Sequence, residues 1–230
     1  MDKVSSLATQ TLIHSAQFVQ GLTSLFTFMA SALLFAYLTH PKPAEYLGLR
    51  KLQNFNVVFL IIPLMIAAVF IFAQIGDWMQ HIDFGKGARA SFDEQQRIMK
   101  TMMQGTSVAD LLLYLLLFAL LPALGEELLF RGVVMRFAYN NGQNIHFAIL
   151  FAAAIFGLAH GSVYNFLPIM LAGVLLGYLY YLSGSIWASI FAHFLNNALG
   201  VFLLFLGNKS IVPKELSEAQ SMPWYFMLFL

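Results

Sequence analysis

Long apolar segments that carry almost no charge recur along the sequence. A transmembrane α-helix needs about 20 consecutive apolar residues, because its rise of about 1.5 Å per residue must cross about 30 Å of hydrocarbon. The sequence predicts an all-α polytopic membrane protein, a helical bundle of about 6–8 transmembrane helices. Six predicted spans lie at residues 19–38, 57–73, 111–135, 147–160, 166–182 and 186–206, and the stretch MPWYFMLFL at 222–230 begins a further one.

The overall composition agrees with a protein that faces lipid rather than water. Hydrophobic residues make up 60% of the chain and charged residues 10%, whereas a soluble domain has about 45–50% and about 25%. We therefore predict an integral membrane protein whose surroundings are membrane lipid. The net charge is +1, and without a basic stripe to neutralise phosphates a nucleic-acid partner is not expected. The absence of cysteine excludes thiolate catalysis, disulfides and cysteine-bound metals.

The chain divides into three parts of one membrane domain. Residues 1–107 hold the first two spans and a polar segment, residues 108–207 hold the spans with buried polar side chains, and residues 208–230 begin a further membrane segment. Basic residues are in excess in the loops at 40–53 and 136–146, and such loops prefer the cytoplasm. The span count places both loops on the same side, so the orientation is self-consistent.

The polar region at 77–107 is predicted to contain an interfacial helix. Ser91 and Glu94 have the spacing of a capping box, which marks a helix start. Gly105 is expected to end the helix. Its apolar residues, Phe92, Met99, Met102 and Met103, favour one side, as in a helix that lies flat on the membrane. The pattern does not distinguish a simple strap from a lid over a substrate entrance.

Two adjacent glutamates and an arginine lie inside the third predicted span, in the stretch ALGEELLFRG at 123–132. A charged side chain at the bilayer centre costs about 2.5–3.5 kcal/mol on insertion scales. Glu127 and Arg131 are four residues apart, which is the spacing of an ion pair on one helix face. We assign this pair a structural supporting role. Glu126 points about 100° away from Glu127 and has no such partner, so we predict that it is functional.

Two later spans present further acid–base or amide side chains. The stretch FGLAH at 156–160 ends in His160, and HFLNN at 193–197 sets His193 and Asn197 on one helix face. A lone intramembrane histidine is as often a hydrogen-bonded structural residue as a functional one. Three helices that each present such groups favour a shared polar cavity. Asn196 is expected to point elsewhere.

Residue counting tests whether these groups reach the same depth. Glu126 lies 16 residues before position 142 and His160 lies 18 residues after it. These separations correspond to about 24 and 27 Å of helix, so the two side chains are expected at one level. His193 is about 13 Å from Gly184, which places it at a different level unless the fifth helix tilts or bends at Pro168.

A carboxylate and a histidine that converge on a water molecule can hydrolyse a peptide bond by general acid–base catalysis. Glu126 would take a proton from the attacking water, and His160 would polarise that water or protonate the leaving amine. His193 and the Asn197 amide would stabilise the oxyanion. No nucleophilic Ser–His or Cys–His arrangement is evident, which argues against a covalent intermediate.

A metal site is the competing interpretation of the same residues. Glu126, His160 and His193 make a set of two histidines and one glutamate, which can hold a divalent metal such as Zn²⁺ with an open position for water. The chain lacks the H-E-x-x-H motif, and the three side chains come from three helices. Spacing excludes neither version, and the metal is the second choice.

Three motifs, in this order on successive membrane helices, carry a family resemblance. Glu-Glu-x-x-x-Arg at 126–131, Phe-x-x-x-His at 156–160 and His-x-x-x-Asn at 193–197 resemble the motifs of the CAAX-processing and bacteriocin-processing intramembrane proteases, also called the CPBP or Abi family, and the chain is similar to its CAAX prenyl proteases. The resemblance covers about residues 108–207. It implies an all-α intramembrane endopeptidase with Glu126 and His160 activating water and His193 and Asn197 stabilising the oxyanion.

The resemblance also bears on partners and location. It implies a peptide or protein substrate, which is a prenylated CAAX tail in eukaryotic and archaeal relatives and elsewhere a bacteriocin or propeptide. The compact chain is typical of a bacterial inner-membrane protein. Two other function classes are kept as alternatives: a non-proteolytic immunity or scaffold protein, and a proton-coupled transporter, since intramembrane Glu and His also build proton relays. Against the transporter, no inverted repeat or paired broken helices are evident.

Overall fold

Every regular element among the described residues is a helix. The structure is a computed structural model that describes residues 3–142 and 144–212, with side chains from Gln10 onward. In these ranges five helices are long and apolar enough to cross a membrane, and a sixth apolar helix is shorter: Gln10–Thr39, Asn56–Gln80, Val108–Asn140, Val163–Ser183 and Ile186–Asn208, with Ile145–Ala159 the shorter one. The prediction of an all-α polytopic membrane protein is confirmed. The further span predicted at 222–230 lies outside the described residues.

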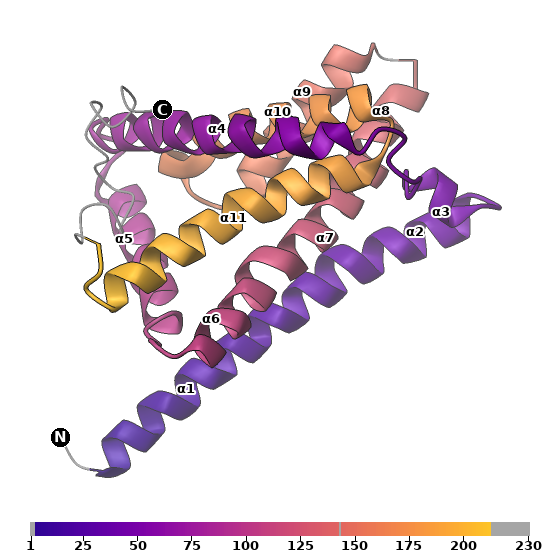
Figure 1. Cartoon of the computed structure of the whole chain (residues 1–230). Coiled ribbons are helices and arrows are strands. Elements are labelled where there is room, and N and C mark those ends of the chain that lie inside the picture. Colours follow the sequence, from indigo (N-terminus) through magenta and orange to yellow (C-terminus); the bar gives the residue numbers. More distant parts are fainter. Residues whose placement is uncertain (1–2, 143, 213–230) are drawn as a thin grey trace.

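The first span is part of one long helical rod (Figure 1). It consists of α1 (Lys3–Leu22), the π-helical segment η1 (Thr23–Ala30) and α2 (Ser31–Thr39). Pro41 and Pro43 then end the rod, and the short helix α3 (Pro43–Tyr46) leads to the second span, α4 (Asn56–Gln80). A proline is tolerated at the first helical position because its missing N–H needs no partner there.

The third span carries the two glutamates and is built from five consecutive segments: α6 (Val108–Tyr114), η2 (Leu115–Leu120), α7 (Leu121–Glu127), η3 (Leu128–Met135) and α8 (Arg136–Asn140). Pro122 cannot donate the backbone hydrogen bond of an α-helix interior, and η2 ends just before it. The π-helical hydrogen bonds of η3 begin directly after Glu127. Such π-helical turns occur frequently at functional sites.

The last three helices are α9 (Ile145–Ala159), α10 (Val163–Ser183) and α11 (Ile186–Asn208). Gly173 and Gly177 lie on the face of α10 that meets α9. A Cβ atom added at Gly173 would lie 3.1 Å from the Ala153 Cα, and one at Gly177 would lie 2.9 Å from a side-chain carbon of Ile149. The small-residue spacing of the sequence therefore does permit close packing of α9 and α10.

The predicted start of the interfacial helix is wrong. The helix α5 (Lys86–Met102) begins five residues before Ser91, with Gly85 at its N-cap position. Glu94 lies inside the helix and accepts hydrogen bonds from Arg97, at 2.6 and 2.8 Å, and these hold the pKa of its carboxyl below the ordinary value. The capping box lies instead at the start of the third span, where the Ser107 hydroxyl accepts from the Asp110 N–H and the Asp110 carboxylate from the Ser107 N–H.

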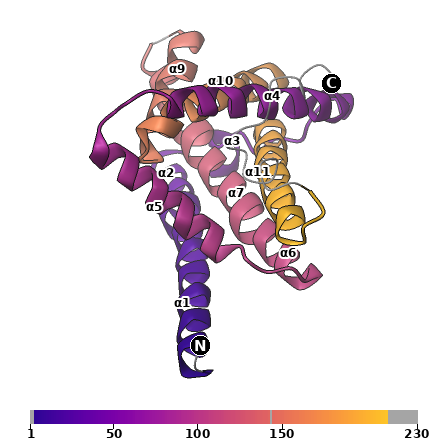
Figure 2. The same cartoon turned by 90° about the vertical axis from the view of Figure 1, so that its left-hand side faces the viewer.

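Helix α5 lies across one side of the bundle (Figure 2). Of the apolar residues that the pattern placed on one side, Phe92, Met102 and Met103 are buried, whereas Met99 is 41% exposed. Two side chains from other helices hold its C-terminal end: Gln17 of α1 donates to the Met102 carbonyl at 2.7 Å and Asn208 of α11 to the Met103 carbonyl at 2.6 Å. The end of α5 is therefore fastened to the first and the last spans.

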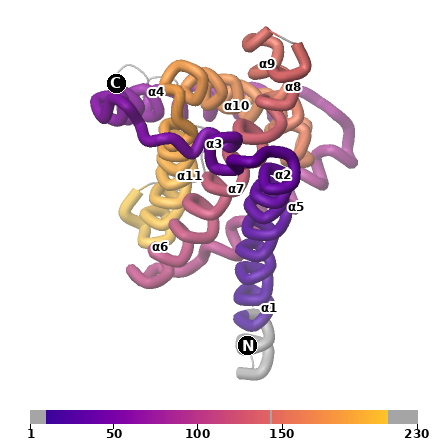
Figure 3. The backbone as a smooth tube through the Cα atoms, turned by 90° about the vertical axis from the view of Figure 1, so that its right-hand side faces the viewer, coloured from indigo at the N-terminus to yellow at the C-terminus, as the bar shows by residue number. Residues whose placement is uncertain are grey.

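The loops at 40–53 and 136–146 meet at the opposite end of the bundle, as the span count predicted. Arg136 donates from Nη1 to the carbonyl oxygens of Glu45 and Tyr46. The Ser185 hydroxyl donates to the Arg50 carbonyl at 2.6 Å. In Figure 3, α3 and its connections lie over the neighbouring ends of α2 and α11.

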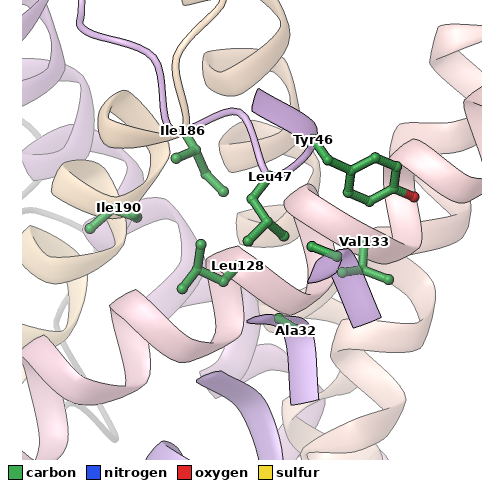
Figure 4. Close-up of a cluster of buried hydrophobic side chains, with 8 residues drawn as sticks. Ala32, Tyr46, Leu47, Leu128, Val133, Ile186 and Ile190 are labelled. Atoms are coloured by element: carbon green, nitrogen blue, oxygen red, sulfur yellow. The ribbon is translucent and has the colours of Figure 1, made fainter. Parts of the chain in front are cut away.

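A hydrophobic cluster joins this end of the bundle together (Figure 4). Leu47, which is fully buried, points between Leu128 and Val133 of the third span and Ile186 of α11. Burying a leucine side chain stabilises a structure by about 1.5–3 kcal/mol where water is the alternative. The cluster fixes the third span against α2 and α11, directly after its two glutamates.

Candidate active site

Helix α9 is too short to cross a bilayer, and this determines where His160 lies. Its 15 residues span about 22 Å, against about 30 Å of hydrocarbon. His160 follows at its C-cap, and Gly161 then turns the chain with a φ of 67° before α10 begins. Helix α5 approaches this turn, since the Gln95 amide lies 3.5 Å from the Gly161 carbonyl oxygen. His160 therefore ends a short helix beneath α5.

One cavity of about 470 Å³ is lined by all four predicted catalytic residues, Glu126, His160, His193 and Asn197. They come from α7, the end of α9 and α11. The expectation that Glu126 and His160 lie at one level agrees with this arrangement. His193, which residue counting placed at a different level, lines the same cavity. The structure brings the predicted residues together.

His193 lies between the two glutamates. Its Nδ1 is 2.9 Å from Oε1 of Glu127, and its Nε2 is 3.8 Å from Oε2 of Glu126. The Glu127 side chain is completely buried, whereas that of Glu126 is 13% exposed. The Nδ1–H therefore donates to Glu127, and Nε2 is directed to the side of the ring where Glu126 lines the cavity.

Glu127 and Arg131 form the predicted ion pair, behind the cavity rather than in it. Arg131 Nη1 lies 2.6 Å from Oε1 of Glu127, and both side chains are at most 1% exposed. The other terminal nitrogen donates to the Gly173 carbonyl at 2.8 Å, and the guanidinium lies 4.9 Å from the centre of the Phe156 ring. A buried charge must be paired and hydrogen-bonded to be tolerated, and these contacts satisfy Arg131.

Phe156 separates the two histidines. Its ring meets the His160 imidazole edge-on at 4.8 Å and the His193 imidazole edge-on at 5.8 Å between centres. Its carbonyl oxygen lies 2.8 Å from Nδ1 of His160. When Nδ1–H makes this hydrogen bond, Nε2 of His160 is the nitrogen left to bind water. Glu126 interacts electrostatically with both imidazoles.

Asn196 was expected to point elsewhere, and this expectation is wrong. It lines the cavity together with Asn197, and its amide nitrogen donates to Oδ1 of Asn197 at 3.1 Å. Among the described residues no protein group accepts from the amide N–H groups of Asn197, so they are available as donors in the cavity. Helical spacing alone did not reveal this contact because it joins adjacent residues, whose side chains lie about 100° apart.

The rest of the cavity wall is mostly apolar and was not predicted as a set. It comes from α4, α5 and its C-cap, η2, α10 and α11, and includes Met65, Met99, Met103, Phe118, Ile169, Leu176 and Val201. Only the one-sided pattern of Met99 and Met103 offered a signal, and it suggested the interfacial helix rather than a cavity wall. An apolar cavity with a few converging polar groups is the usual form of a ligand site.

The metal interpretation does not fit this arrangement. No group of three His, Asp or Glu side chains within the described ranges is placed so that it could hold a metal ion. His193 directs Nδ1 to Glu127 and His160 directs Nδ1 to a backbone carbonyl, so only Nε2 of each ring could bind a metal, and in the described residues these nitrogens and Glu126 do not form such a group. We therefore derive no step through a metal.

These observations define a class: a polytopic helical membrane protein with an acid–base cluster at a cavity among its spans. Residues 108–199 match the Type II CAAX prenyl endopeptidase Rce1-like family. This confirms the resemblance predicted from the three motifs. The chain is also 25% identical, over 204 residues, to "Putative membrane peptidase YdiL" of Bacillus subtilis. The aligned region covers 87% of this chain and 79% of that protein. No solved structure matches the chain.

Proposed function

We propose that this protein is an intramembrane endopeptidase that hydrolyses a peptide bond with water activated by Glu126 and His160. The observation that carries the proposal is the single cavity lined by Glu126, His160, His193 and Asn197, side chains from three helices. The match of residues 108–199 to a family of membrane endopeptidases supports the same reaction. The peptide substrate reaches the cavity from within the lipid, and its class is a lipidated tail or a propeptide.

The reaction needs no covalent intermediate. Glu126 accepts a proton as the water oxygen attacks the carbonyl carbon of the scissile bond, and Nε2 of His160 holds the same water. The carbonyl oxygen becomes an oxyanion that accepts hydrogen bonds from the Asn197 amide and from His193, which in its imidazolium form carries a proton on Nε2 as well as the one that Nδ1 donates to Glu127. The C–N bond then breaks, and the proton passes from Glu126 to the leaving amine.

Glu127 and Arg131 position this machinery without touching the substrate. Glu127 accepts the Nδ1–H of His193 and so fixes which way the ring faces. Arg131 neutralises Glu127 and ties it to α10 through the Gly173 carbonyl. Because the pair is buried, its role differs from that of the partly exposed Glu126.

The direct test is Glu126→Gln in purified full-length protein reconstituted in liposomes with a fluorogenic membrane peptide. Loss of a general base is expected to lower the cleavage rate by about 10²–10⁴-fold. The matched control is Glu94→Gln on α5, where the carboxylate is exposed and paired with Arg97. Parental turnover in Glu126→Gln would refute the proposal.

Two further measurements separate this proposal from its rivals. Activity that survives a strong chelator, together with elemental analysis of the purified protein, distinguishes water activated by side chains from a metalloenzyme. Solute flux without peptide cleavage would favour a proton-coupled transporter. If a Glu126→Gln variant gave the same bacteriocin protection as the parent and neither protein cleaved peptides, an immunity or scaffold role would replace the enzyme.

A further inference from the structure

A second cavity lies at the end of the bundle opposite α5. It measures about 220 Å³ and shares no lining residue with the candidate active site. Its polar wall comes from the 40–53 loop, α8 and the end of α10: Arg50, Arg136, Tyr139, Asn140, Tyr180 and Tyr181. Two arginines thus line a small cavity at the edge of the membrane-spanning region.

Arg136 is held rigidly on one side of this cavity. Its Nη1 donates to the carbonyl oxygens of Glu45 and Tyr46, and its guanidinium lies 5.0 Å from the centre of the Tyr46 ring. Tyr180 interacts electrostatically with both Arg136 and Arg50. The cavity is therefore built around a fixed guanidinium and a tyrosine hydroxyl.

Arg50 supplies a second positive charge that no carboxylate of the described residues neutralises. It is exposed, and among the described residues its guanidinium makes no hydrogen bond or ion pair. Glu45 also lines the cavity, but its carboxylate is exposed and lies 3.3 Å from the Lys42 ammonium. The cavity therefore has an excess of positive charge, and its chemistry suits an anion with several acceptor oxygens.

Exposed apolar side chains also lie next to lining residues along α8 and α10. Tyr139 is 50% exposed and Tyr181 48%, while the neighbouring Phe137 and Leu182 are 57% and 77% exposed. Tyrosine is typical of the level of lipid headgroups, and exposed Phe and Leu side chains suit the acyl chains below it. An occupant with an anionic head and apolar chains would satisfy both parts of this surface.

We propose that this cavity binds an anionic glycerophospholipid through its phosphate, which accepts hydrogen bonds from Arg50 and the Tyr180 hydroxyl beside Arg136. Arginine suits phosphate because its N–H groups match two phosphate oxygens at once. Basic pockets between spans are a known mode of recognition of anionic lipid headgroups. Free inorganic phosphate shares the chemistry of the head but not that of the chains, so an experiment can separate the two.

The test measures lipid binding to the full-length protein in a neutral detergent by native mass spectrometry. The probes are dioleoylphosphatidylglycerol, dioleoylphosphatidylcholine and inorganic phosphate. The parent is expected to bind phosphatidylglycerol in preference to the zwitterionic lipid. Arg50→Gln should weaken that binding about tenfold, the effect of losing a charged hydrogen bond. Arg50→Lys keeps the charge but loses the bidentate geometry, so its affinity for phosphatidylglycerol should lie between those of the parent and Arg50→Gln.

The matched control is Lys51→Gln, because Lys51 is the adjacent exposed cation and does not line the cavity. It should retain the parental affinity. Equal binding by the parent and Arg50→Gln would overturn the proposal, and so would an equal loss in Lys51→Gln, which would indicate diffuse charge attraction. Displacement of the lipid by equimolar inorganic phosphate would show that the ligand of the cavity is a free phosphate ion and not a lipid. An unchanged unfolding midpoint in Arg50→Gln ensures that the comparison concerns binding.

Discussion

At the scale of single residues, one oxygen atom connects the structural and the chemical parts of the candidate site. Oε1 of Glu127 accepts both from Arg131, at 2.6 Å, and from Nδ1 of His193, at 2.9 Å. Its other oxygen has no hydrogen-bond partner among the described residues. The Glu127 carboxylate therefore has two roles: it forms an ion pair within its own helix, and it orients the His193 imidazole at the cavity.

Replacing Glu127 by Gln should affect stability more than any change at Glu126. The substitution leaves Arg131 as an uncompensated buried charge, and such a loss costs about 3–5 kcal/mol. The change should appear as a lower unfolding midpoint in detergent, measured by circular dichroism during heating. An unaltered midpoint would mean that the ion pair contributes nothing to the fold.

The double variant Glu127→Leu with Arg131→Leu separates the two roles. Replacing both members of a buried ion pair by apolar side chains is often neutral, so the midpoint should return toward that of the parent. Peptide cleavage should remain low, because His193 no longer has an acceptor for its Nδ1–H. Parental cleavage in this double variant would show that Glu127 does not position the histidine.

At the scale of elements, a close approach of two spans determines where Glu126 lies. Gly125 precedes the glutamates, and a Cβ added there would lie 2.8 Å from the Ser24 carbonyl oxygen and 3.0 Å from the Phe28 Cβ, both of η1. A contact of this kind leaves no room for a side chain. The backbone of α7 can therefore press against η1 only because residue 125 has no Cβ.

A Gly125→Val variant should push α7 away from η1. Overpacking of a close contact costs about 1–3 kcal/mol, and the displaced helix carries Glu126 with it. We expect a lower unfolding midpoint together with reduced cleavage in liposomes. Gly76→Ala on α4 is the matched control, since its added Cβ would find its nearest neighbour, the Pro168 Cγ, at an ordinary 3.8 Å. Equal behaviour of the two variants would contradict the proposed packing role.

At the scale of the whole molecule, hydrogen bonds of the connecting segments mark the two ends of the helical bundle. The 40–53 loop contacts Arg136 and Ser185 at one end. At the other end α5 meets the turn at Gly161, and the residue after α5 meets Asn208. The second cavity therefore opens at the end that carries the basic loops, and the candidate active site lies toward α5.

The absence of cysteine allows this topology to be measured directly. Single cysteines introduced as Lys51→Cys and Asn141→Cys should react with a membrane-impermeant maleimide from the same side of sealed vesicles. Glu94→Cys on α5 should react only from the opposite side. All three positions are exposed in the structure. Labelling of residues 51 and 94 from one side would show that α4 does not cross the membrane.

Residue spacing along one helix predicted some of these features well and others poorly. The Glu127–Arg131 pair followed from a separation of four residues, and five of the predicted spans followed from the length of apolar runs, since both depend only on helical rise and turn. The fourth predicted span, 147–160, was wrong, because α9 has only 15 residues and does not reach the length of a span. The start of α5 was misplaced because Ser-x-x-Glu also occurs inside helices, and the true cap at Ser107 uses Asp rather than Glu.

The sequence by itself determined the membrane-spanning class, the ion pair and the residues that resemble a peptidase family. Only the tertiary structure decided that His193 meets both glutamates, that Asn196 joins Asn197 at the cavity, and that an arginine of the 40–53 loop and one of α8 share a second cavity. The physical reason is that periodicity gives the face and height of a side chain on its own helix. Distances between helices depend instead on how closely the backbones pack, at contacts such as those of Gly125 and Gly173.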